Sequence, residues 1–160
     1  MNIKEVLNDK NIDFSGIPLP YFLIGLLSAF ENRFQAMADK TMKEISWKQF
    51  FAIICIKMCK ESPTINELAE IMGSSHQNVK QILLKLEKKD FVKIIIDKDD
   101  KRKQRILLTE HCKEFCQKND AMSQAIMESL FYQISPEQLQ TTIKTIIQVE
   151  DNLKKLEGEG

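Results

Sequence analysis

Residues Thr64 to Thr109 read TINELAEIMGSSHQNVKQILLKLEKKDFVKIIIDKDDKRKQRILLT, and this stretch decides the fold. Thr64 and Glu67 have the spacing of a capping box, which starts a helix, and Gly73 suits the left-handed residue that ends one. Ser75 can cap a second helix, whose apolar residues recur at helical spacing at Val79, Ile82, Leu83 and Leu86. Two helices joined by such a turn form a helix-turn-helix, and its second helix is normally presented to the DNA major groove.

A charged hairpin is predicted after the second helix. The segment DKDDKRK, residues 97–103, is too charged to bury and is expected to protrude between two strands. Alternation of apolar and polar residues predicts inward-facing side chains at Val92, Ile94 and Ile96, and on the return strand at Ile106 and Leu108. A helix-turn-helix with a projecting hairpin is a winged helix, whose wing can reach the DNA backbone or an adjacent minor groove.

The whole stretch resembles a known family. LAEIMG, SSHQNVKQILLKLEKKDFV and DDKRKQRILLTE look like the DNA-binding lobe of the multiple-antibiotic-resistance regulator (MarR) family, in the family's order. The family pattern runs LAxxxG, then a Ser/Thr-rich recognition helix ending in LExxGxV, then a wing with D-x-R and a closing LT. The match is continuous from Leu68 to Glu110 and departs at Asp90, where the family usually has glycine. Aspartate tolerates the left-handed conformation better than most residues, so this departure is minor.

The resemblance implies a function as well as a fold. It implies a homodimeric, sequence-specific transcription regulator that represses pseudo-palindromic operators in double-stranded DNA. It also implies that Arg102 enters the minor groove or meets phosphate, while Asp100 holds the wing in shape. Family members often release DNA when a small, frequently aromatic effector enters the cleft between the dimer helices and the DNA lobe. The sequence assigns no effector residue.

The polar residues of the second helix suit contacts with DNA. At 100° per residue, Gln77 and Gln81 point away from the apolar face, and Asn78, Lys80 and Lys85 lie on its flanks. Amide side chains can pair bidentately with adenine, whereas lysines and a serine hydroxyl suit phosphate. The predicted DNA-binding residues are Ser75, Gln77, Asn78, Lys80, Gln81, Lys85, Lys101 and Arg102.

The remaining sequence predicts a mainly α fold. We expect a single domain over residues 1–160, with a winged helix-turn-helix lobe at about 45–109 and long dimerisation helices at about 18–41 and 110–157. Capping boxes at Ser46–Gln49 and Ser135–Gln138 mark two of the helix starts, and residues 1 to about 17 are expected to be an irregular arm. The long helices have more apolar surface than one small lobe can cover, and this predicts a homodimer.

The charge of the chain is unevenly distributed. The formal net charge is zero, but residues 74–105 contain ten basic and five acidic residues, so this segment carries +5 and the remainder −5. Attraction to phosphate depends on the local field rather than on the total charge. The basic residues coincide with the elements expected to meet DNA, although lysines that only solubilise an exposed surface are the plain alternative.

Two other functions remain open at this point. The cysteines form two pairs at i, i+4 spacing, Cys55/Cys59 and Cys112/Cys116, so a thiol- or metal-sensing regulator on the same scaffold is one alternative. Buried cysteine usually behaves as a small hydrophobe, and two ligands on one helix are only half of a zinc site. A winged-helix module for protein contacts is the other alternative.

Several classes of function are disfavoured. The sequence has no glycine-rich phosphate loop and no telling pairing of histidine with a nucleophile or carboxylate, so we predict neither an enzyme nor a bound cofactor or metal. No apolar run reaches 18 residues, so a membrane partner is not expected. Four unpaired-looking cysteines and the lack of a signal peptide predict a cytoplasmic protein.

Overall fold

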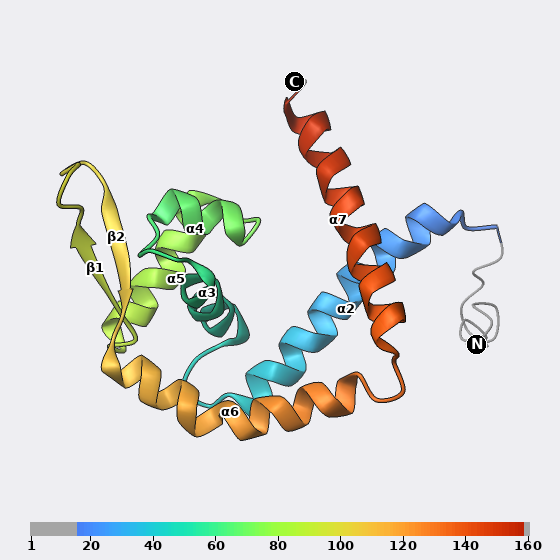
Figure 1. Cartoon of the computed structure of the whole chain (residues 1–160), viewed down its shortest axis with the longest axis horizontal. Helices are drawn as coiled ribbons and strands as arrows, with labels where there is room; N and C mark the ends of the chain where they lie inside the picture. Colours follow the sequence, from blue (N-terminus) through green and yellow to red (C-terminus); the bar gives the residue numbers. More distant parts are fainter. Residues whose placement is uncertain (1–15, 159–160) are drawn as a thin grey trace. The chain divides into compact units, whose positions relative to one another are not determined.

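The computed structural model describes residues 16–158, so the predicted arm at residues 1 to about 17 lies almost wholly outside the described residues (Figure 1). The chain divides into two compact units, residues 1–112 and 113–160. The fold is mainly α with one small antiparallel sheet, as the sequence predicts. In chain order the elements are α2 (Leu19–Thr41), α3 (Trp47–Met58), α4 (Ile65–Ile71), α5 (His76–Lys88), β1 (Val92–Ile96), β2 (Gln104–Leu108), α6 (Glu110–Leu130) and α7 (Pro136–Gly158).

Helix α3 lies at the centre of the first unit. It contacts α2, α4, α5 and β2, and its residues Ala52, Ile53, Cys55 and Ile56 are buried. A helix that is apolar nearly all round can be stable only when neighbours cover several of its faces. Helix α3 therefore forms the centre of this unit.

Two predicted capping boxes fix where the helices of this unit begin. The Gln49 amide donates to the Ser46 hydroxyl at 3.3 Å, and the Ser46 amide donates to the Gln49 side chain at 3.0 Å. The Glu67 amide donates to the Thr64 hydroxyl at 3.2 Å, and the Thr64 amide donates to the Glu67 carboxylate at 2.7 Å. Each box satisfies two amides that have no partner inside the helix.

The wing has the predicted register but a shorter buried face. Val92 pairs with Leu108, and Ile94 pairs with Ile106, so the expected inward positions do face one another. Val92 and Ile106 are buried. The prediction that Ile96 faces the core is wrong, because its side chain is 64% exposed. The hairpin has left the lobe by that point, so the alternating pattern continues where there is no core to cover.

The second unit contains most of α6 and the whole of α7. Helix α6 ends at Leu130, and Gln133 in the turn that follows has a left-handed backbone with φ of 59°. The predicted box at the start of α7 is present: the Gln138 amide donates to the Ser135 hydroxyl at 3.2 Å, and the Ser135 amide donates to the Gln138 side chain at 2.9 Å.

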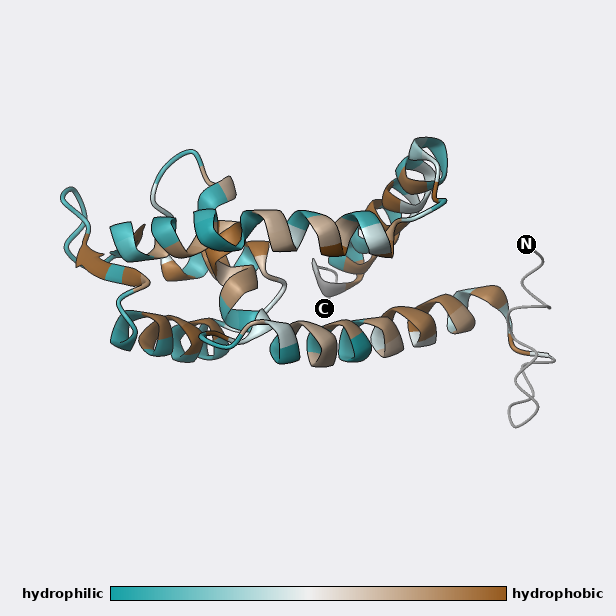
Figure 2. Cartoon of the chain, turned by 90° about the horizontal axis from the view of Figure 1, so that it is seen from below, coloured by the Kyte–Doolittle hydropathy of each residue, from teal (hydrophilic) through white to brown (hydrophobic). Residues whose placement is uncertain are grey.

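Large apolar side chains are exposed on the long helices of this single chain. Within α2 only Ala38 is buried, and the N-terminal half of the helix is mostly hydrophobic (Figure 2). Phe30 on α2 is 55% exposed and Ile147 on α7 is 51% exposed. Isolated exposed apolar residues are ordinary, but repeated ones along two helices are typical of surfaces that other protein covers. Within the described residues, none of the helices combines the length and hydropathy that a membrane crossing requires.

Candidate nucleic-acid interface

A tight turn connects α4 to α5 and sets the direction of α5. Gly73 has φ of 57°, a conformation that glycine adopts without the penalty of a side chain, and the Ser74 amide donates to the Ala69 carbonyl at 2.9 Å. The Ser75 hydroxyl accepts the Asn78 amide at 3.2 Å and caps α5. This geometry agrees with the helix-turn-helix predicted from Gly73 and Ser75.

Helix α5 is divided between a buried face and a polar outer face. Val79, Leu83 and Leu86 are fully buried and Ile82 is nearly so, which fixes the rotation of the helix about its axis. The outer residues predicted to meet DNA are all exposed, and they are Gln77, Asn78, Lys80, Gln81 and Lys85. The structure therefore gathers them on one surface, and their individual roles stay predictions.

One of these side chains already has a partner. The Asn78 side-chain amide donates to the Ser74 hydroxyl at 2.8 Å. An asparagine side chain has two amide hydrogens and one carbonyl oxygen, so one hydrogen and the oxygen remain for other partners. The bond restricts the orientation of Asn78 without removing its capacity for a bidentate contact.

The base of the wing is fixed to the end of α5. Asp90 takes the left-handed conformation, with φ of 59°, at the position where the MarR pattern has glycine. The Thr109 hydroxyl donates to the Asp90 carbonyl and accepts the Cys112 amide at 3.1 Å, so Thr109 both closes the hairpin and caps α6. Phe91 is buried beneath this junction, edge-on to the His111 ring.

The tip of the wing is organised by Asp100. Its carboxylate accepts the backbone amide and the Nε of Arg102, both at 3.1 Å, and its carbonyl accepts the Lys103 amide at 2.8 Å. These bonds to the Arg102 side chain and backbone hold the pKa of Asp100 below its usual value. The Arg102 side chain is nevertheless 90% exposed, so it can exchange this surface pair for another anion. The contacts are those expected of a carboxylate that shapes the wing.

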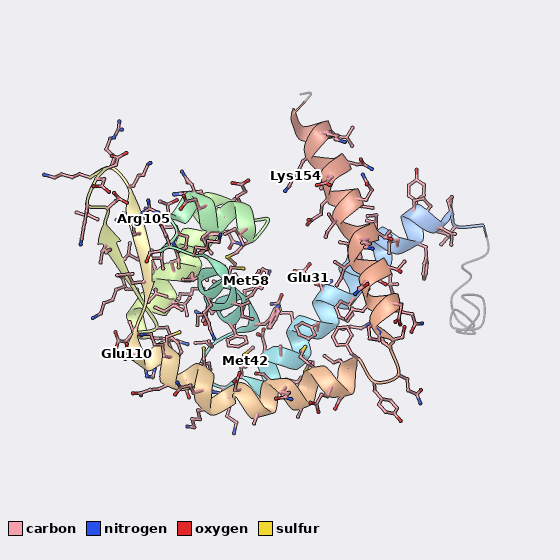
Figure 3. The ribbon with its side chains drawn as sticks, in the orientation of Figure 1. Glu31, Met42, Met58, Arg105, Glu110 and Lys154 are labelled. Atoms are coloured by element: carbon pink, nitrogen blue, oxygen red, sulfur yellow. The ribbon has the colours of Figure 1, made fainter. Side chains whose placement is uncertain are left out.

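Arg105 is a structural residue that the sequence analysis missed. Its guanidinium donates to Asp97 at 2.5 Å and to the Ser62 carbonyl at 2.9 Å, and it lies 3.5 Å from the Glu67 carboxylate (Figure 3). The Ile106 amide also donates to the Pro63 carbonyl at 2.9 Å. Arg105 thereby ties both strands of the wing to the segment that leads into α4.

The expectation that residues 97–103 are all too charged to bury is wrong for Asp97. Its side chain is only 10% exposed. Besides Arg105, it accepts the amides of Asp99 and Asp100 at 2.8 and 2.9 Å, so it closes the turn at the start of the tip. A carboxylate can be buried when charge-assisted hydrogen bonds of this kind surround it.

Comparison with known proteins agrees with this geometry. Residues 45–103, which span α3 to the wing tip, match the model of the MarR family. This lobe therefore has the sequence pattern of the MarR family. Members among the solved structures are described as transcriptional regulators. No protein with a curated description matches this chain.

Solved structures share the fold at low sequence identity. A MarR/EmrR family transcriptional regulator from Acinetobacter sp. ADP1 superposes with a TM-score of 0.76 at 14% identity, over 87% of this chain and 99% of that one. S. aureus MepR in complex with DNA gives 0.71 at 18% identity, over 80% and 95%. Streptococcus pneumoniae FabT in complex with DNA gives 0.63 at 18% identity, over 85% and 98%. These likenesses establish the MarR fold.

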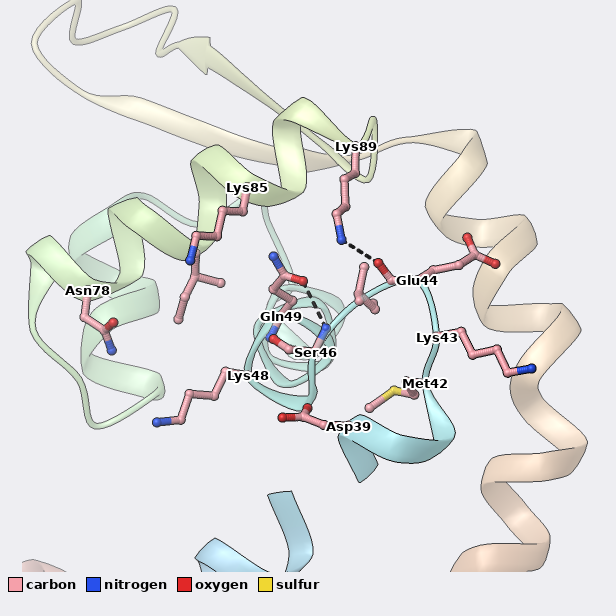
Figure 4. Close-up of a pocket in the computed structure, with 12 residues that line it drawn as sticks. Asp39, Met42, Lys43, Glu44, Ser46, Lys48, Gln49, Asn78, Lys85 and Lys89 are labelled. Carbon is pink, nitrogen blue, oxygen red and sulfur yellow. Dashed lines mark hydrogen bonds between the residues drawn. The ribbon is translucent and has the colours of Figure 1, made fainter. Parts of the chain in front are cut away.

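A hollow lies beside α5 on the flank away from the wing. Its volume is about 530 Å³, and its walls are the end of α2, the segment from Lys43 to Gln49 and one side of α5 (Figure 4). Four lysines line it: Lys43, Lys48, Lys85 and Lys89. Of these the sequence analysis singled out only Lys85 as a contact, because the meeting of α3 with α5 is a property of the fold.

The four cysteines are free thiols packed within helices. Cys55 and Cys112 are buried, whereas Cys59 and Cys116 are partly exposed. Burial raises the pKa of the Cys55 thiol, and the neighbouring Cys59 adds to this effect. A reactive thiol needs a lowered pKa, so this environment disfavours Cys55 as a redox sensor. Within the described residues, no group of three metal-binding side chains comes together.

The Asp97–Arg105 pair is expected to make the stability of the lobe depend on pH in the acid range. The Arg105 guanidinium and the backbone amides lower the pKa of Asp97 from 3.8 to about 2. A carboxyl whose pKa is lower in the folded state contributes stability above its unfolded pKa, and this contribution is lost as the pH falls through the folded pKa. In Asp97→Asn, we expect a lower thermal midpoint than wild type at pH 5 and a difference that narrows between pH 4 and pH 2. Asp99→Asn, which changes an exposed carboxylate two residues away, is the control; an equal deficit there would contradict the role of Asp97.

Proposed function

We propose that this MarR-family transcription regulator binds specific sequences in double-stranded DNA as a homodimer and represses transcription from pseudo-palindromic operators. The observation that carries the proposal is the outer face of α5, where exposed amide and lysine side chains lie beside a wing with an exposed guanidinium at Arg102. Amides suit base edges in the major groove, and an arginine suits the negative potential of a narrow minor groove. The DNA complexes of MepR and FabT, which share this fold, support the choice of partner.

The homodimer is supported by the apolar residues of the long helices. Phe30, Ile143, Ile147 and Leu153 are all more than 45% exposed in the single chain. Burial of such side chains against a second copy would remove apolar surface from water at about 25 cal/mol per Å². A two-fold dimer would present two α5 helices to successive turns of the duplex, which are about 34 Å apart.

Release by a small-molecule effector is the further part of the proposal, and it follows from the family rather than from any residue of this chain. The thiol- or metal-sensing alternative would require a reactive cysteine, and the raised pKa of Cys55 speaks against that residue. A module for protein contacts would explain the fold but not the row of amides and lysines on α5. The cytoplasmic location stays a prediction from the sequence.

Selection of bound duplexes from a random pool tests the proposal. The full chain should enrich one motif made of two inverted half-sites, with centres about 10 base pairs apart. Recovery of unrelated sequences without a shared motif would contradict sequence-specific binding. No recovery of duplex DNA at low salt would favour the protein-contact module instead.

The first mutational prediction tests whether the wing contacts DNA. Arg102→Ala should weaken binding to the selected duplex at least tenfold, because a cation is lost from each wing, while thermal midpoint and dimer mass stay unchanged. Affinity is measured by fluorescence anisotropy at fixed salt. Lys118→Ala, which removes an exposed positive charge from α6, is the matched control. Equal affinities for the two variants would remove the wing tip from the DNA contact.

A further inference from the structure

We propose that the hollow beside α5 holds a backbone phosphate of the bound duplex, and that Lys48 of α3 contacts it together with Lys85 of α5. The inference rests on the proposed function, because it names a part of the surface that would meet DNA. Lys48 lies outside both the helix-turn-helix and the wing, at the second position of α3.

The side chains around the hollow point in different directions. In Figure 4 the amines of Lys48 and Lys85 extend to the same side of the hollow, where Asn78 also lies, whereas Lys43 points away. The Lys89 amine instead donates to the Glu44 carbonyl at 2.5 Å and links α5 to the segment before α3. Lys89 therefore fixes the shape of the hollow, while Lys48 and Lys85 supply the charge on its open side.

The acidic residues near the hollow do not neutralise these two lysines. The Asp39 carboxylate accepts the Trp47 amide at 2.5 Å, so its charge faces the positive end of α3. The Glu44 carboxylate points away from Lys48 and Lys85 in Figure 4. Within residues 16–158 neither Lys48 nor Lys85 forms an ion pair, and both side chains are exposed. An anion would therefore meet two cations that have no competing partner in the described part of the chain.

The position of the hollow suits a duplex bound along α5. A second, smaller depression of about 150 Å³ lies on the opposite flank of α5, between His76 and the wing residues Arg102 and Lys103. The major groove is about 12 Å wide and is bounded by a phosphate backbone on each side. A helix in that groove has one backbone on each flank. In the proposed complex the wing contacts one of these phosphate backbones, and Lys48 and Lys85 contact the other.

Salt titration of full-length variants tests the proposal. A phosphate contact contributes about 0.9 to the slope of log affinity against log salt, so Lys48→Met in both lobes of a dimer should lower the slope by about 1.8. Relative to 1 M salt, where the logarithm of the salt concentration is zero, this change in slope equals a roughly 30-fold loss of affinity at 0.15 M salt. The loss should be the same on the selected duplex and on an unrelated duplex of equal length, because a phosphate contact carries no sequence information.

Two further variants control for charge and for global effects. Lys48→Arg should restore the slope, since it keeps the cation. Lys57→Met removes an exposed lysine from the other end of α3 and should change the affinity for neither duplex. Equal slopes for Lys48→Met and Lys57→Met, with specific binding by the wild type intact, would overturn this proposal alone. A wild type that binds neither duplex would overturn the proposed function as well.

Discussion

Ile147→Glu on α7 is expected to weaken binding to the selected duplex at least 100-fold. Ile147 is half-exposed in the single chain, and the proposed dimer covers it. A buried glutamate without a partner carries a large desolvation cost, so the variant should be monomeric. A monomer has one lobe where the dimer has two, and linking two binding modules typically multiplies affinity by about 10² to 10⁴.

Two quantities are measured for each variant: the molecular mass in solution and the affinity for the selected duplex. Light scattering at the protein concentration used for the DNA titration should report the mass of one chain for Ile147→Glu and of two for wild type. Thr145→Glu adds the same charge about 200° away around α7 and should keep both the dimer and the affinity. A variant at Ile147 that stays dimeric would exclude this face of α7 from the interface.

The double substitution Gln77→Ala, Gln81→Ala should abolish most of the preference for the selected sequence. Both side chains are exposed at the centre of the outer face of α5. A good bidentate contact between an amide and adenine discriminates against the wrong base by about 1–3 kcal/mol. Two such contacts in each lobe predict that the ratio of affinities for the selected and an unrelated duplex falls at least 100-fold.

The unrelated duplex supplies the internal control for this variant. Its affinity should change less than about threefold, because phosphate contacts provide nearly all of non-specific binding. Gln117→Ala, which truncates an exposed glutamine on α6, should leave both affinities unchanged. A double variant that loses both affinities in parallel would mean that these amides position the helix without reading bases.

The features predicted correctly from the sequence are those that depend on near neighbours in the chain. The capping box of Thr64 and Glu67 joins residues three positions apart, and both of its hydrogen bonds form. The left-handed Gly73 and the buried face of α5 likewise follow from local spacing. Asp90 also adopts the left-handed backbone that the family pattern requires of its glycine.

The features that were missed depend on contacts between distant segments. Arg105 reaches the Ser62 carbonyl, 43 positions away, and nothing in the spacing of charges distinguishes it from the other basic residues of the wing. Lys48 meets the flank of α5 only because α3 packs against that helix. The prediction for Ile96 was wrong for a related reason. Alternation predicts which face of a strand a side chain lies on, but not how far the core extends along the strand.

Methylation interference on the selected duplex tests most directly that two α5 helices lie in the major groove with a wing beside each. Dimethyl sulfate modifies guanine N7 in the major groove and adenine N3 in the minor groove, so one reaction reports on both. We predict two clusters of N7 interference with centres about 10 base pairs apart, each flanked by N3 interference that disappears with Arg102→Ala. A single cluster, or interference confined to the minor groove, would contradict the account.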